Sequence, residues 1–381
     1  MSATLLLIFC CVSLLFLAVT VFILLRARNT IPDLCQPLSQ FSHRSVSIIV
    51  PARNEARDID ACLKSLLGQQ GVDLELLVVN DHSTDGTGAI IDAIARRDNR
   101  VKALHNPELK PGWFGKANAM QTAAAQARND YLLFTDADVE HAPEVLWAAI
   151  TEMEKGSYDF MTLVPRFEVR TFWENVDLPM IVSGLLLLTT KHLEDPDRPD
   201  AVGGGAFMLV RRTVFEAVGG FESIRAEMLD DVGLARLIKR NRFKVGIRKA
   251  VDRLHLEMFK TNREAFIAPT KNILIVGGRH PWLALPVPLL AAIQFWSPPI
   301  AVVCGLLHGD ALLTAVGAGT YLLHYSSLYL ARPVFDFQPL KLLAFPLVVL
   351  VIGTCTVRAL YFYYVKGSVA WRGRVLKHSG R

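Results

Sequence analysis

Cysteine is scarce in this sequence, and its placement builds neither a disulfide framework nor a zinc site. The 381 residues contain six cysteines, four of which lie in long apolar runs. The other two, Cys35 and Cys62, stand far apart and without the paired spacing of zinc ligands. This excludes a small secreted disulfide scaffold and agrees with a reducing, cytoplasmic environment for the central part of the chain.

A glycine-rich phosphate loop is also missing. The first expected strand runs into Pro51-Ala52-Arg53-Asn54-Glu55 rather than into G-x-G-x-x-G or a P-loop. This disfavours a dinucleotide oxidoreductase and a P-loop ATPase. The net charge is only +5, and no basic stripe with interleaved aromatic residues is present, so we expect no nucleic-acid partner.

Charge is absent from residues 3–25, and Arg26 and Arg28 follow this apolar run directly. A helix of this length can cross a hydrocarbon core of roughly 30 Å. A cleaved signal peptide is the alternative, but no Lys or Arg precedes the run, and the run exceeds a typical signal-peptide core. We therefore expect an uncleaved anchor in residues 1–28 and a linker in residues 29–43.

The C-terminal part is again apolar. Residues 283–365 contain about three expected spans, 283–307, 311–330 and 342–364, between a membrane-interface segment at 261–282 and a basic tail at 366–381. By the positive-inside rule, Arg26 and Arg28 place the central domain on the cytoplasmic side. We expect an integral membrane protein, of a bacterial inner membrane. One plus three spans would leave the basic tail outside, unless the proline-rich first stretch is re-entrant.

Residues 44–260 alternate between strand, loop and helix patterns, which predicts an α/β domain with a mostly parallel sheet. We expect strands at Ser45–Val50, Leu74–Val79, Val101–Leu104 and Tyr131–Phe134, and helices at Asp58–Leu67 and Lys116–Ala127. A further helix should follow the second strand, with Ser83 or Thr84 as its N-cap.

Polar residues follow the ends of these strands. Asn54 and Glu55 follow the first, Asp81 the second, and Asp136 and Asp138 the fourth, while Lys116 begins the helix before it. Parallel strands joined by right-handed crossovers align their carboxyl ends, so these side chains should share one edge of the sheet. Each could also be an ordinary turn or helix-start residue. Two carboxylates one residue apart suit a divalent cation shared with a phosphate, and Lys116 could add positive charge there.

Three later features have two interpretations each. The apolar run Met180–Leu188, beside Trp173, is either a membrane-interface helix or a core helix. The Gly203–Phe207 segment could let a bulky ligand approach its backbone, or it could be a flexible turn. Asp230 and Asp231 open a helix, where a carboxylate either complements the helix dipole or accepts a proton from an attacking hydroxyl.

Six motifs together resemble the family 2 glycosyltransferases with a GT-A fold, in the order of that family over residues 44 to about 260. They are Pro51-Ala-Arg-Asn-Glu55, Asn80-Asp81-His-Ser-Thr-Asp85-Gly-Thr87, Gly115-Lys116-Ala-Asn-Ala119, Asp136-Ala-Asp138, Gly219-Gly220-Phe221 and Asp230-Asp231. Among members, the sequence looks most like the hopanoid-biosynthesis-associated glycosyltransferases, then like ceramide glucosyltransferases and carotenoid-modifying relatives.

The resemblance implies a Rossmann-like catalytic domain that binds a nucleotide-diphosphate sugar, with a UDP-sugar as the first expectation. Pro51, Asn54 and Glu55 match the family's loop around the nucleoside, and Asp81 matches the aspartate that holds the base. Lys116, expected at the same edge of the sheet, would help to neutralise the donor phosphates beside the metal.

The resemblance also implies the metal site and the base. Asp136 and Asp138 match the family's DxD pair, with Asp138 on the Mg²⁺ or Mn²⁺ that bridges the donor diphosphate. Asp231 matches the general base, but Asp230 replaces the family's Glu, so which of the two acts stays open. His255 could be a further metal ligand or an ordinary loop histidine.

One family motif is missing. Processive and ceramide-type members carry Gln-x-x-Arg-Trp on a helix at the membrane, where this sequence reads Pro269-Thr270-Lys271-Asn272. Lys271 could supply the cation of that motif toward the leaving diphosphate. The missing tryptophan argues against a polysaccharide synthase.

We predict an inverting glycosyltransferase that moves a single sugar to a hydroxyl of a membrane lipid of hopanoid, sphingolipid, carotenoid or polyprenyl type. Gly204, Gly205 and Phe207 would lie against this acceptor. Alternatives are a processive polysaccharide synthase, which should have more spans, and a non-catalytic membrane scaffold, which should have lost its carboxylates. A sugar nucleotidyltransferase would need the missing glycine-rich loop.

Overall fold

The computed structural model divides the chain into two compact units, which we describe separately. The sheet unit comprises residues 30–167 and 189–257, and the helical unit comprises residues 1–29, 168–188 and 258–381. The described residues are 3–28, 31–36, 44–178, 194–195, 201–227, 229–270, 273, 281–329, 334–366, 368–371 and 374–377.

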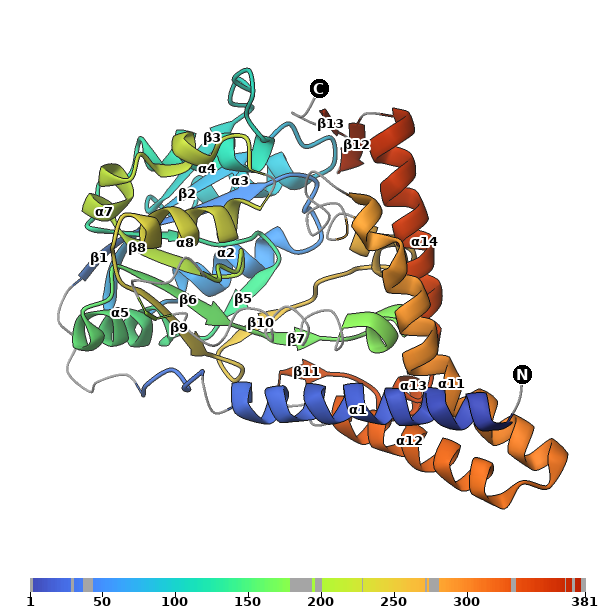
Figure 1. The fold of residues 1–381 in the computed structure, drawn as a ribbon. Coiled ribbons are helices and arrows are strands. Elements are labelled where there is room, and N and C mark those ends of the chain that lie inside the picture. Colours follow the sequence, from blue (N-terminus) through green and yellow to red (C-terminus); the bar gives the residue numbers. More distant parts are fainter. Residues whose placement is uncertain are drawn as a thin grey trace. The chain divides into compact units, whose positions relative to one another are not determined.

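A seven-stranded sheet in the order β3-β2-β1-β4-β8-β6-β9 forms the centre of the sheet unit (Figure 1). Its strands, in chain order, are β1 (Arg44–Ala52), β2 (Val72–Asn80), β3 (Val101–His105), β4 (Tyr131–Phe134), β6 (Phe160–Val164), β8 (Met208–Arg211) and β9 (Val245–Lys249). The pairs β1–β2, β2–β3, β1–β4 and β6–β9 are parallel. Only β8 runs against its neighbours β4 and β6 among these seven strands. The prediction of a mostly parallel α/β sheet is confirmed.

Both faces of this sheet are buried, which explains why its strands are continuous apolar runs. Ile48 and Ile49 point to opposite faces of β1, and both are 0% exposed. The sheet is accompanied by helices α2 (Ile59–Leu67), α3 (Thr87–Ala95), α4 (Gly115–Ala124), α5 (Val145–Gly156), α7 (Arg212–Ala217) and α8 (Asp230–Arg240), and by the 3₁₀ helix η2 (Gly220–Ile224).

One predicted helix start is wrong. Helix α3 begins at Thr87 with Gly86 at the N-cap, so neither Ser83 nor Thr84 caps it. Instead, Asp85 Oδ1 accepts hydrogen bonds from the backbone N–H and the hydroxyl of Thr87. Ser83 is occupied elsewhere, because its hydroxyl accepts the N–H of Asn54.

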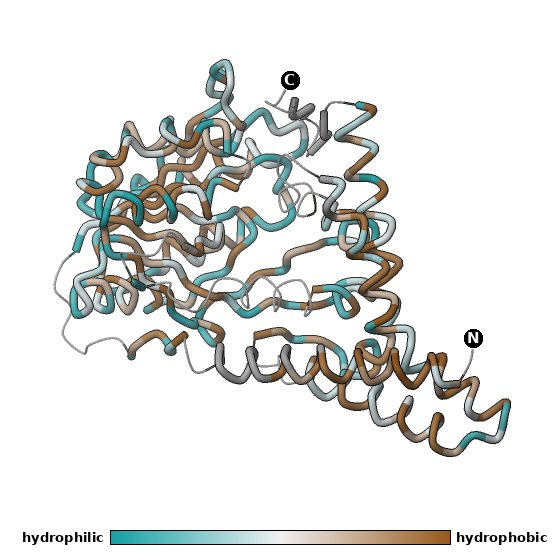
Figure 2. Tube along the Cα trace, viewed as in Figure 1, coloured by the Kyte–Doolittle hydropathy of each residue, from teal (hydrophilic) through white to brown (hydrophobic). Residues whose placement is uncertain are grey.

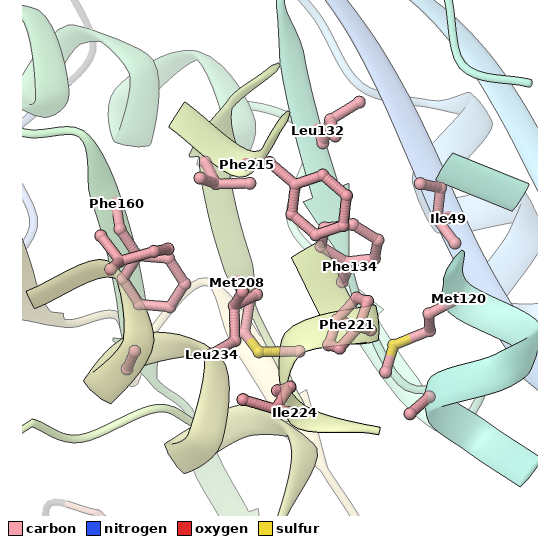
Figure 3. Packing of buried hydrophobic residues seen from close by; sticks show 14 of the residues in the cluster. Ile49, Met120, Leu132, Phe134, Phe160, Met208, Phe215, Phe221, Ile224 and Leu234 are labelled. Carbon is pink, nitrogen blue, oxygen red and sulfur yellow. The ribbon is translucent and has the colours of Figure 1, made fainter. Parts of the chain in front are cut away.

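An aromatic cluster anchors one face of the sheet at β4 (Figure 3). The ring of Phe134 lies 5.2 Å from that of Phe215 and 4.9 Å from that of Phe221. Phe221 follows the Gly219-Gly220 pair, whose φ angles of 78° and 54° are left-handed and favour glycine. The last residue of β4 is therefore fixed in the core directly before the Asp136 loop.

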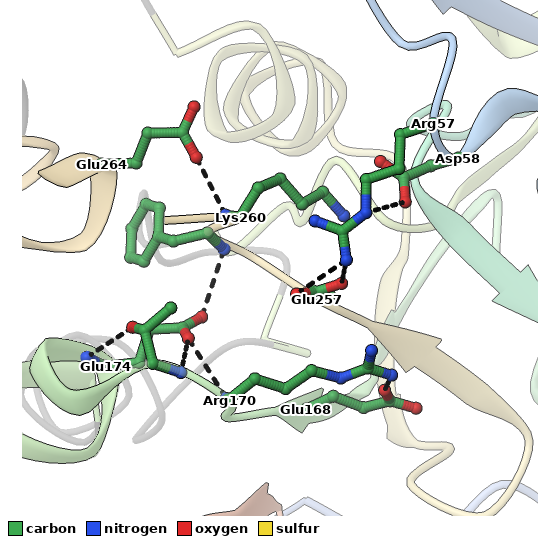
Figure 4. A network of polar contacts seen from close by, with 10 residues as sticks. Arg57, Asp58, Glu168, Arg170, Glu174, Glu257, Lys260 and Glu264 are labelled. Atoms are coloured by element: carbon green, nitrogen blue, oxygen red, sulfur yellow. Dashed lines mark hydrogen bonds and ion pairs between the residues drawn. The ribbon is translucent and has the colours of Figure 1, made fainter. Parts of the chain in front are cut away.

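A small sheet continues from that loop. Strand β5 (Val139–His141) pairs antiparallel with β10 (Leu254–Leu256), and β10 pairs parallel with β7 (Arg166–Glu168). In this register His255 lies opposite Glu140. Arg57 Nη2 reaches the Glu257 carboxylate at 3.0 Å, just beyond β10 (Figure 4).

The helical unit contains the long apolar helices, which colour brown in Figure 2. Its elements are α1 (Ala3–Arg28), a helix over residues 172–178, α9 (Asn262–Ile267), η3 (Pro281–Ala284), α11 (Pro286–His308), α12 (Ala311–Tyr329), β11 (Phe335–Asp336), α13 (Pro339–Leu342), η4 (Phe345–Leu347), α14 (Val348–Tyr361), the π-helical η5 (Phe362–Lys366), β12 (Ser368–Trp371) and β13 (Arg374–Lys377). Side chains of α1, α11 and α12 pack together around Leu6, Cys10, Ala301 and Leu313.

Two helical stretches are long and apolar enough to cross a membrane, namely Pro286–His308 and Phe345–Lys366. The second expected C-terminal span, residues 311–330, forms the 19-residue helix α12, which does not reach the same hydropathy. In α1, the apolar part that can be assessed is Ala3–Leu15. The number of spans stays a prediction.

The buried carboxylate of Glu174 accepts hydrogen bonds at the start of the helix over residues 172–178 (Figure 4). Glu174 is 0% exposed, and its Oε2 accepts the backbone N–H groups of Arg170 and Thr171 at 3.2 and 2.8 Å. Its Oε1 accepts the N–H of Phe259 at 3.2 Å. Glu174 thus ties this helix to the segment that leads into α9, and its burial reflects that structural role.

Candidate active site

The carboxyl ends of β1 and β2 lie side by side, as the sequence predicts. Pro51 and Ala52 pair with Val79 and Asn80 in the parallel register. The N–H of Asp81 then donates to the carbonyl of Ala52 at 2.8 Å. The two loops that follow these strands therefore begin at the same edge of the sheet.

Hydrogen bonds join these two loops to each other. Asn54 adopts a left-handed backbone with φ 55°, and its Oδ1 accepts the N–H of Thr84 at 2.8 Å. The N–H of Glu55 donates to the hydroxyl of Thr87 at 2.8 Å. The Asn54 side chain and the Glu55 backbone thus hold the two loops together.

Asp81 directly follows β2 and is buried, with 5% of its surface exposed. Its Oδ1 lies 3.1 Å from Nδ1 of His82. Arg53 Nη1 donates to the Asp81 carbonyl at 3.0 Å. Arg53 was not predicted as a site residue. Its place in the Pro-Ala-Arg-Asn-Glu motif could have indicated that it belongs to the site.

Lys116 joins two carboxylates that are far apart in the sequence. Its Nζ lies 2.6 Å from Asp136 Oδ1 and 3.3 Å from Asp230 Oδ2. Lys116 belongs to the first turn of α4, Asp136 follows β4, and Asp230 opens α8. The prediction that Lys116 and Asp136 share one edge of the sheet is confirmed, and Asp230 joins them there.

The charges of the neighbouring carboxylates decide the protonation state of Lys116. Burial by itself would lower the pKa of Lys116, but the carboxylates of Asp136, Asp230 and Asp231 raise it above its usual value. Lys116 is therefore a permanent cation. The carboxylates of Asp136, Asp230 and Asp231 thus act together on one lysine.

Asp138 and Asp136 face the thiol of Cys62 from the DxD loop. Cys62 Sγ lies 3.5 Å from the carbonyl of Asp136. Burial raises the pKa of this thiol, and the charges of Asp138, Asp136 and Glu55 raise it further. Cys62 is thus a neutral core residue that packs against the Asp136 loop. Its isolated position in the sequence did not predict this contact.

The donor set suits a hard divalent cation, although it does not form a complete cage. Carboxylate oxygens favour Mg²⁺ or Mn²⁺. Asp136 is paired with Lys116, and the role of Asp138 as a metal ligand stays a prediction. No group of three or more His, Cys, Asp or Glu in the described part of the chain is arranged to hold a metal. His255, on β10, is not part of such a group.

Asp231 is held by backbone donors at the start of α8. Its Oδ2 accepts the N–H of Gly205 at 3.1 Å, and its Oδ1 accepts the N–H of Val232 at 2.8 Å. These bonds fix the carboxylate beside the Lys116 cluster. Asp230 and Asp231 differ here, because Asp230 is the one that pairs with Lys116.

The Gly203–Phe207 segment lies against this cluster. The carbonyl of Gly205 accepts the N–H of Asp136 at 3.0 Å. Phe207 is 0% exposed, and its ring packs 6.3 Å from that of His141. The proposed acceptor contact of Gly204, Gly205 and Phe207 stays a prediction, and the buried ring of Phe207 gives it a core role in this structure.

Lys271 and the Met180–Leu188 run lie outside the described residues, so their predicted roles stay predictions. Near them in the sequence, a pocket of about 340 Å³ opens within the helical unit. It is lined by Trp173, Asn262, Arg263, Phe266 and Ile267. The rings of Trp173 and Phe266 meet edge to face at 4.7 Å, and the Trp173 N–H donates to Asn262 Oδ1 at 3.2 Å.

Comparison with known proteins gives consistent results. The sequence profile of Glycosyl transferase family 2 matches residues 47–219. A 4,4'-diaponeurosporenoate glycosyltransferase of Staphylococcus aureus strain MRSA252 is 26% identical over 349 residues, which cover 88% of each chain. The protein of that name from strain USA300 is 24% identical over the same length and coverage.

A solved structure shares the fold. It is a mannosyltransferase from Pyrobaculum calidifontis in complex with GDP-Man and Mn²⁺. The likeness covers 92% of this chain and 99% of the other, with a TM-score of 0.57 and 19% sequence identity.

Proposed function

Because the chain belongs to glycosyl transferase family 2, we propose that it transfers one sugar from a nucleotide-diphosphate sugar to a membrane lipid, with inversion at the anomeric carbon. The chain is a glycosyltransferase with the GT-A fold. The observation that carries the finer proposal is the position of Lys116 between Asp136 and Asp230, at the carboxyl edge of the sheet.

The donor nucleotide would lie along the edge formed by β1, β2 and β4. Pro51, Asn54 and Glu55 belong to the loop around the nucleoside, and Asp81 would hold the base. The likeness in fold to a mannosyltransferase solved with GDP-Man supports a nucleotide-sugar donor. We propose a UDP-sugar as the first donor to test.

Asp138, together with Asp136, would hold a Mg²⁺ or Mn²⁺ ion, which supplies positive charge against the departing nucleotide diphosphate. Lys116 adds a fixed cation beside it. His255 is a proposed additional ligand because it lies opposite Glu140, two residues beyond Asp138. Lys271 is proposed as a second cation near the diphosphate.

We propose Asp231 as the general base. Asp230 Oδ2 pairs with Lys116, whereas both carboxylate oxygens of Asp231 are oriented by backbone N–H groups, those of Gly205 and Val232. Asp231 would take the proton of an acceptor hydroxyl as that oxygen attacks the anomeric carbon. A single displacement of this kind inverts the anomeric centre.

The acceptor is proposed to be a lipid. Two helices of the helical unit have the length and hydropathy of membrane spans. The pocket at Trp173 and Phe266 is lined by three apolar residues together with Asn262 and Arg263, which suits part of an amphiphile. The Staphylococcus aureus relatives, named for 4,4'-diaponeurosporenoate, support an apolar acceptor for this chain as well.

The test is transfer by the purified full-length protein with Mn²⁺ or Mg²⁺, a panel of nucleotide sugars and a total lipid extract. Mass spectrometry should find one lipid that gains a single sugar mass. Alkaline hydrolysis then separates an alkali-stable glycoside, expected for a hydroxyl acceptor, from a labile glycosyl ester. A ladder of products would favour the processive polysaccharide synthase, and no product with any donor would contradict the proposal.

A further inference from the structure

We infer that Gly205 is a positioning residue that sets the spacing between Asp136, on the donor side of the site, and Asp231, on the acceptor side. The inference rests on the proposed function for the meaning of these two sides. The contacts that carry it belong to the sheet unit alone.

Gly205 contacts both aspartates through its backbone. Its carbonyl accepts the N–H of Asp136 at 3.0 Å, and its N–H donates to Asp231 Oδ2 at 3.1 Å. One peptide segment therefore fixes the DxD loop and the start of α8 together.

Lys116 completes a closed ring of contacts. Lys116 Nζ lies 2.6 Å from Asp136 and 3.3 Å from Asp230 Oδ2. Asp230 is bonded in the chain to Asp231, and Gly205 connects Asp231 back to Asp136 through its two backbone hydrogen bonds. In a closed ring, no member shifts without displacing its neighbours. The donor-side and acceptor-side carboxylates are therefore mechanically linked.

The ring has no room for a side chain at position 205. A Cβ on Gly205 would lie 2.6 Å from Asp136 Oδ2 and 3.1 Å from Lys116 Nζ. A contact below 3.0 Å forces a shift, and here both obstructing atoms are the ends of side chains rather than backbone. Alanine at this position should consequently displace the Asp136 carboxylate and the Lys116 ammonium while the fold remains.

The neighbouring Gly204 is different. A Cβ there would meet only Thr162 Oγ1 at 3.6 Å, which is an ordinary contact. The requirement for glycine at position 205 thus concerns the catalytic carboxylates, whereas position 204 tolerates a methyl group sterically. The contrast between the two positions makes it possible to test the spacing role of Gly205 apart from a contact of the same segment with the acceptor.

The experiment compares Gly205→Ala with Gly204→Ala and with Gly68→Ala in the full-length protein. Gly68 lies outside the site, and a Cβ there would be 3.4 Å from the nearest backbone oxygen. We expect Gly205→Ala to lower kcat about 100-fold, because a displacement of about 1 Å in a catalytic site has an effect of that size. Gly68→Ala should leave kcat unchanged, and Gly204→Ala should affect at most the acceptor KM.

Binding provides a readout that does not depend on turnover. Gly205→Ala should weaken Mn²⁺-dependent binding of the nucleoside diphosphate, by about 10-fold or more for a lost charge-assisted contact, and leave binding of the nucleoside monophosphate unchanged. The hydrogen bonds of Gly205 go to Asp136 and Asp231, so a local shift there affects the diphosphate, whereas a general loss of structure would weaken the binding of both ligands. Equal binding of the diphosphate by Gly205→Ala and the unaltered protein, with kcat retained, would overturn the inference.

A second variant covers the case in which Gly205→Ala does not fold. Asp230→Asn keeps the side-chain size and weakens the ring at Lys116, so kcat should fall about 10-fold while nucleoside monophosphate binding is retained. An unchanged kcat in Asp230→Asn would show that the ring does not position the base. Absence of transfer by the unaltered protein would count against the proposed function instead, and the diphosphate-binding comparison would still decide the role of Gly205.

Discussion

Lys116 Nζ lies 2.6 Å from Asp136 Oδ1, so a cation occupies the position directly beside the first carboxylate of the Asp136-Ala137-Asp138 motif. This pair has a consequence for the metal. Asp136 is shared with an ammonium group, and we propose that Asp138 is the carboxylate that a divalent ion would bind first. Separate substitutions of Lys116 and Asp138 test this division of roles.

Replacing Lys116 with methionine should lower transfer about 100-fold, because a fixed positive charge beside the departing diphosphate is lost. The matched control is Lys64→Met. Lys64 pairs with Asp60 at 2.7 Å on the surface, and its side chain is 69% exposed, so loss of that pair should change little. Steady-state kinetics of both variants checks this. Equal activity of Lys116→Met and Lys64→Met would contradict a role for Lys116.

Asp138→Asn should abolish Mn²⁺-dependent activity, with a loss of about 1000-fold or more, because a neutral amide is a poor ligand for a hard cation. Asp98→Asn serves as the control, since Asp98 pairs with Arg100 away from the site. A Mn²⁺ titration of the transfer rate gives the readout. If Asp138→Asn reached the unaltered rate at high Mn²⁺, Asp138 would only tune affinity for the ion.

The two carboxylates of α8 should respond differently to the same change. Asp231→Asn should lower kcat by about 1000-fold or more, as expected when a general base is removed. Asp230→Asn should lower it only about 10-fold, because its partner Lys116 stays in place. Single-turnover rates with saturating donor compare the two variants. The reverse order of losses would assign the base to Asp230.

Asp177→Asn should change how stability depends on pH. Asp177 is 0% exposed, burial raises its pKa to about 8, and the Glu174 charge contributes. Between about pH 4 and pH 8 the folded protein keeps a proton that the unfolded chain releases, so stability falls as the pH rises, by up to about 1.4 kcal/mol per pH unit.

The asparagine variant cannot ionise, so its Tm should fall less than that of the unaltered protein between pH 5 and pH 8. Asp252→Asn, at an exposed position, is the control and should follow the unaltered protein. Parallel Tm curves for all three proteins would mean that Asp177 does not hold a proton in the folded state.

The full-length protein should stay in the membrane pellet after an alkaline carbonate wash. Pro286–His308 and Phe345–Lys366 each present enough apolar length to cross the hydrocarbon core, and extraction would expose that surface to water. Detergent should release the protein. Release by carbonate alone would indicate surface attachment rather than spanning helices.

Local sequence patterns determined most of the sheet unit. The apolar run Tyr131–Phe134 forms β4 at the predicted bounds, because four consecutive apolar residues before two carboxylates leave a buried strand as the stable arrangement. Asp230 and Asp231 open α8, where carboxylates complement the helix dipole. The α3 cap was mispredicted because the competing partner of Ser83 is Asn54, 29 residues earlier in the chain.

The sequence by itself determined which chemical groups are delivered to the carboxyl edge of the sheet, since strand ends and helix starts are local properties. Only the tertiary structure decided which of them meet. The antiparallel strand β8 directs the Gly203–Phe207 segment between β4 and α8, and this placement pairs Lys116 with Asp230 and sets Gly205 between Asp136 and Asp231. These contacts join residues up to 114 positions apart, from Lys116 to Asp230, and no periodicity in the sequence encodes a distance of that kind.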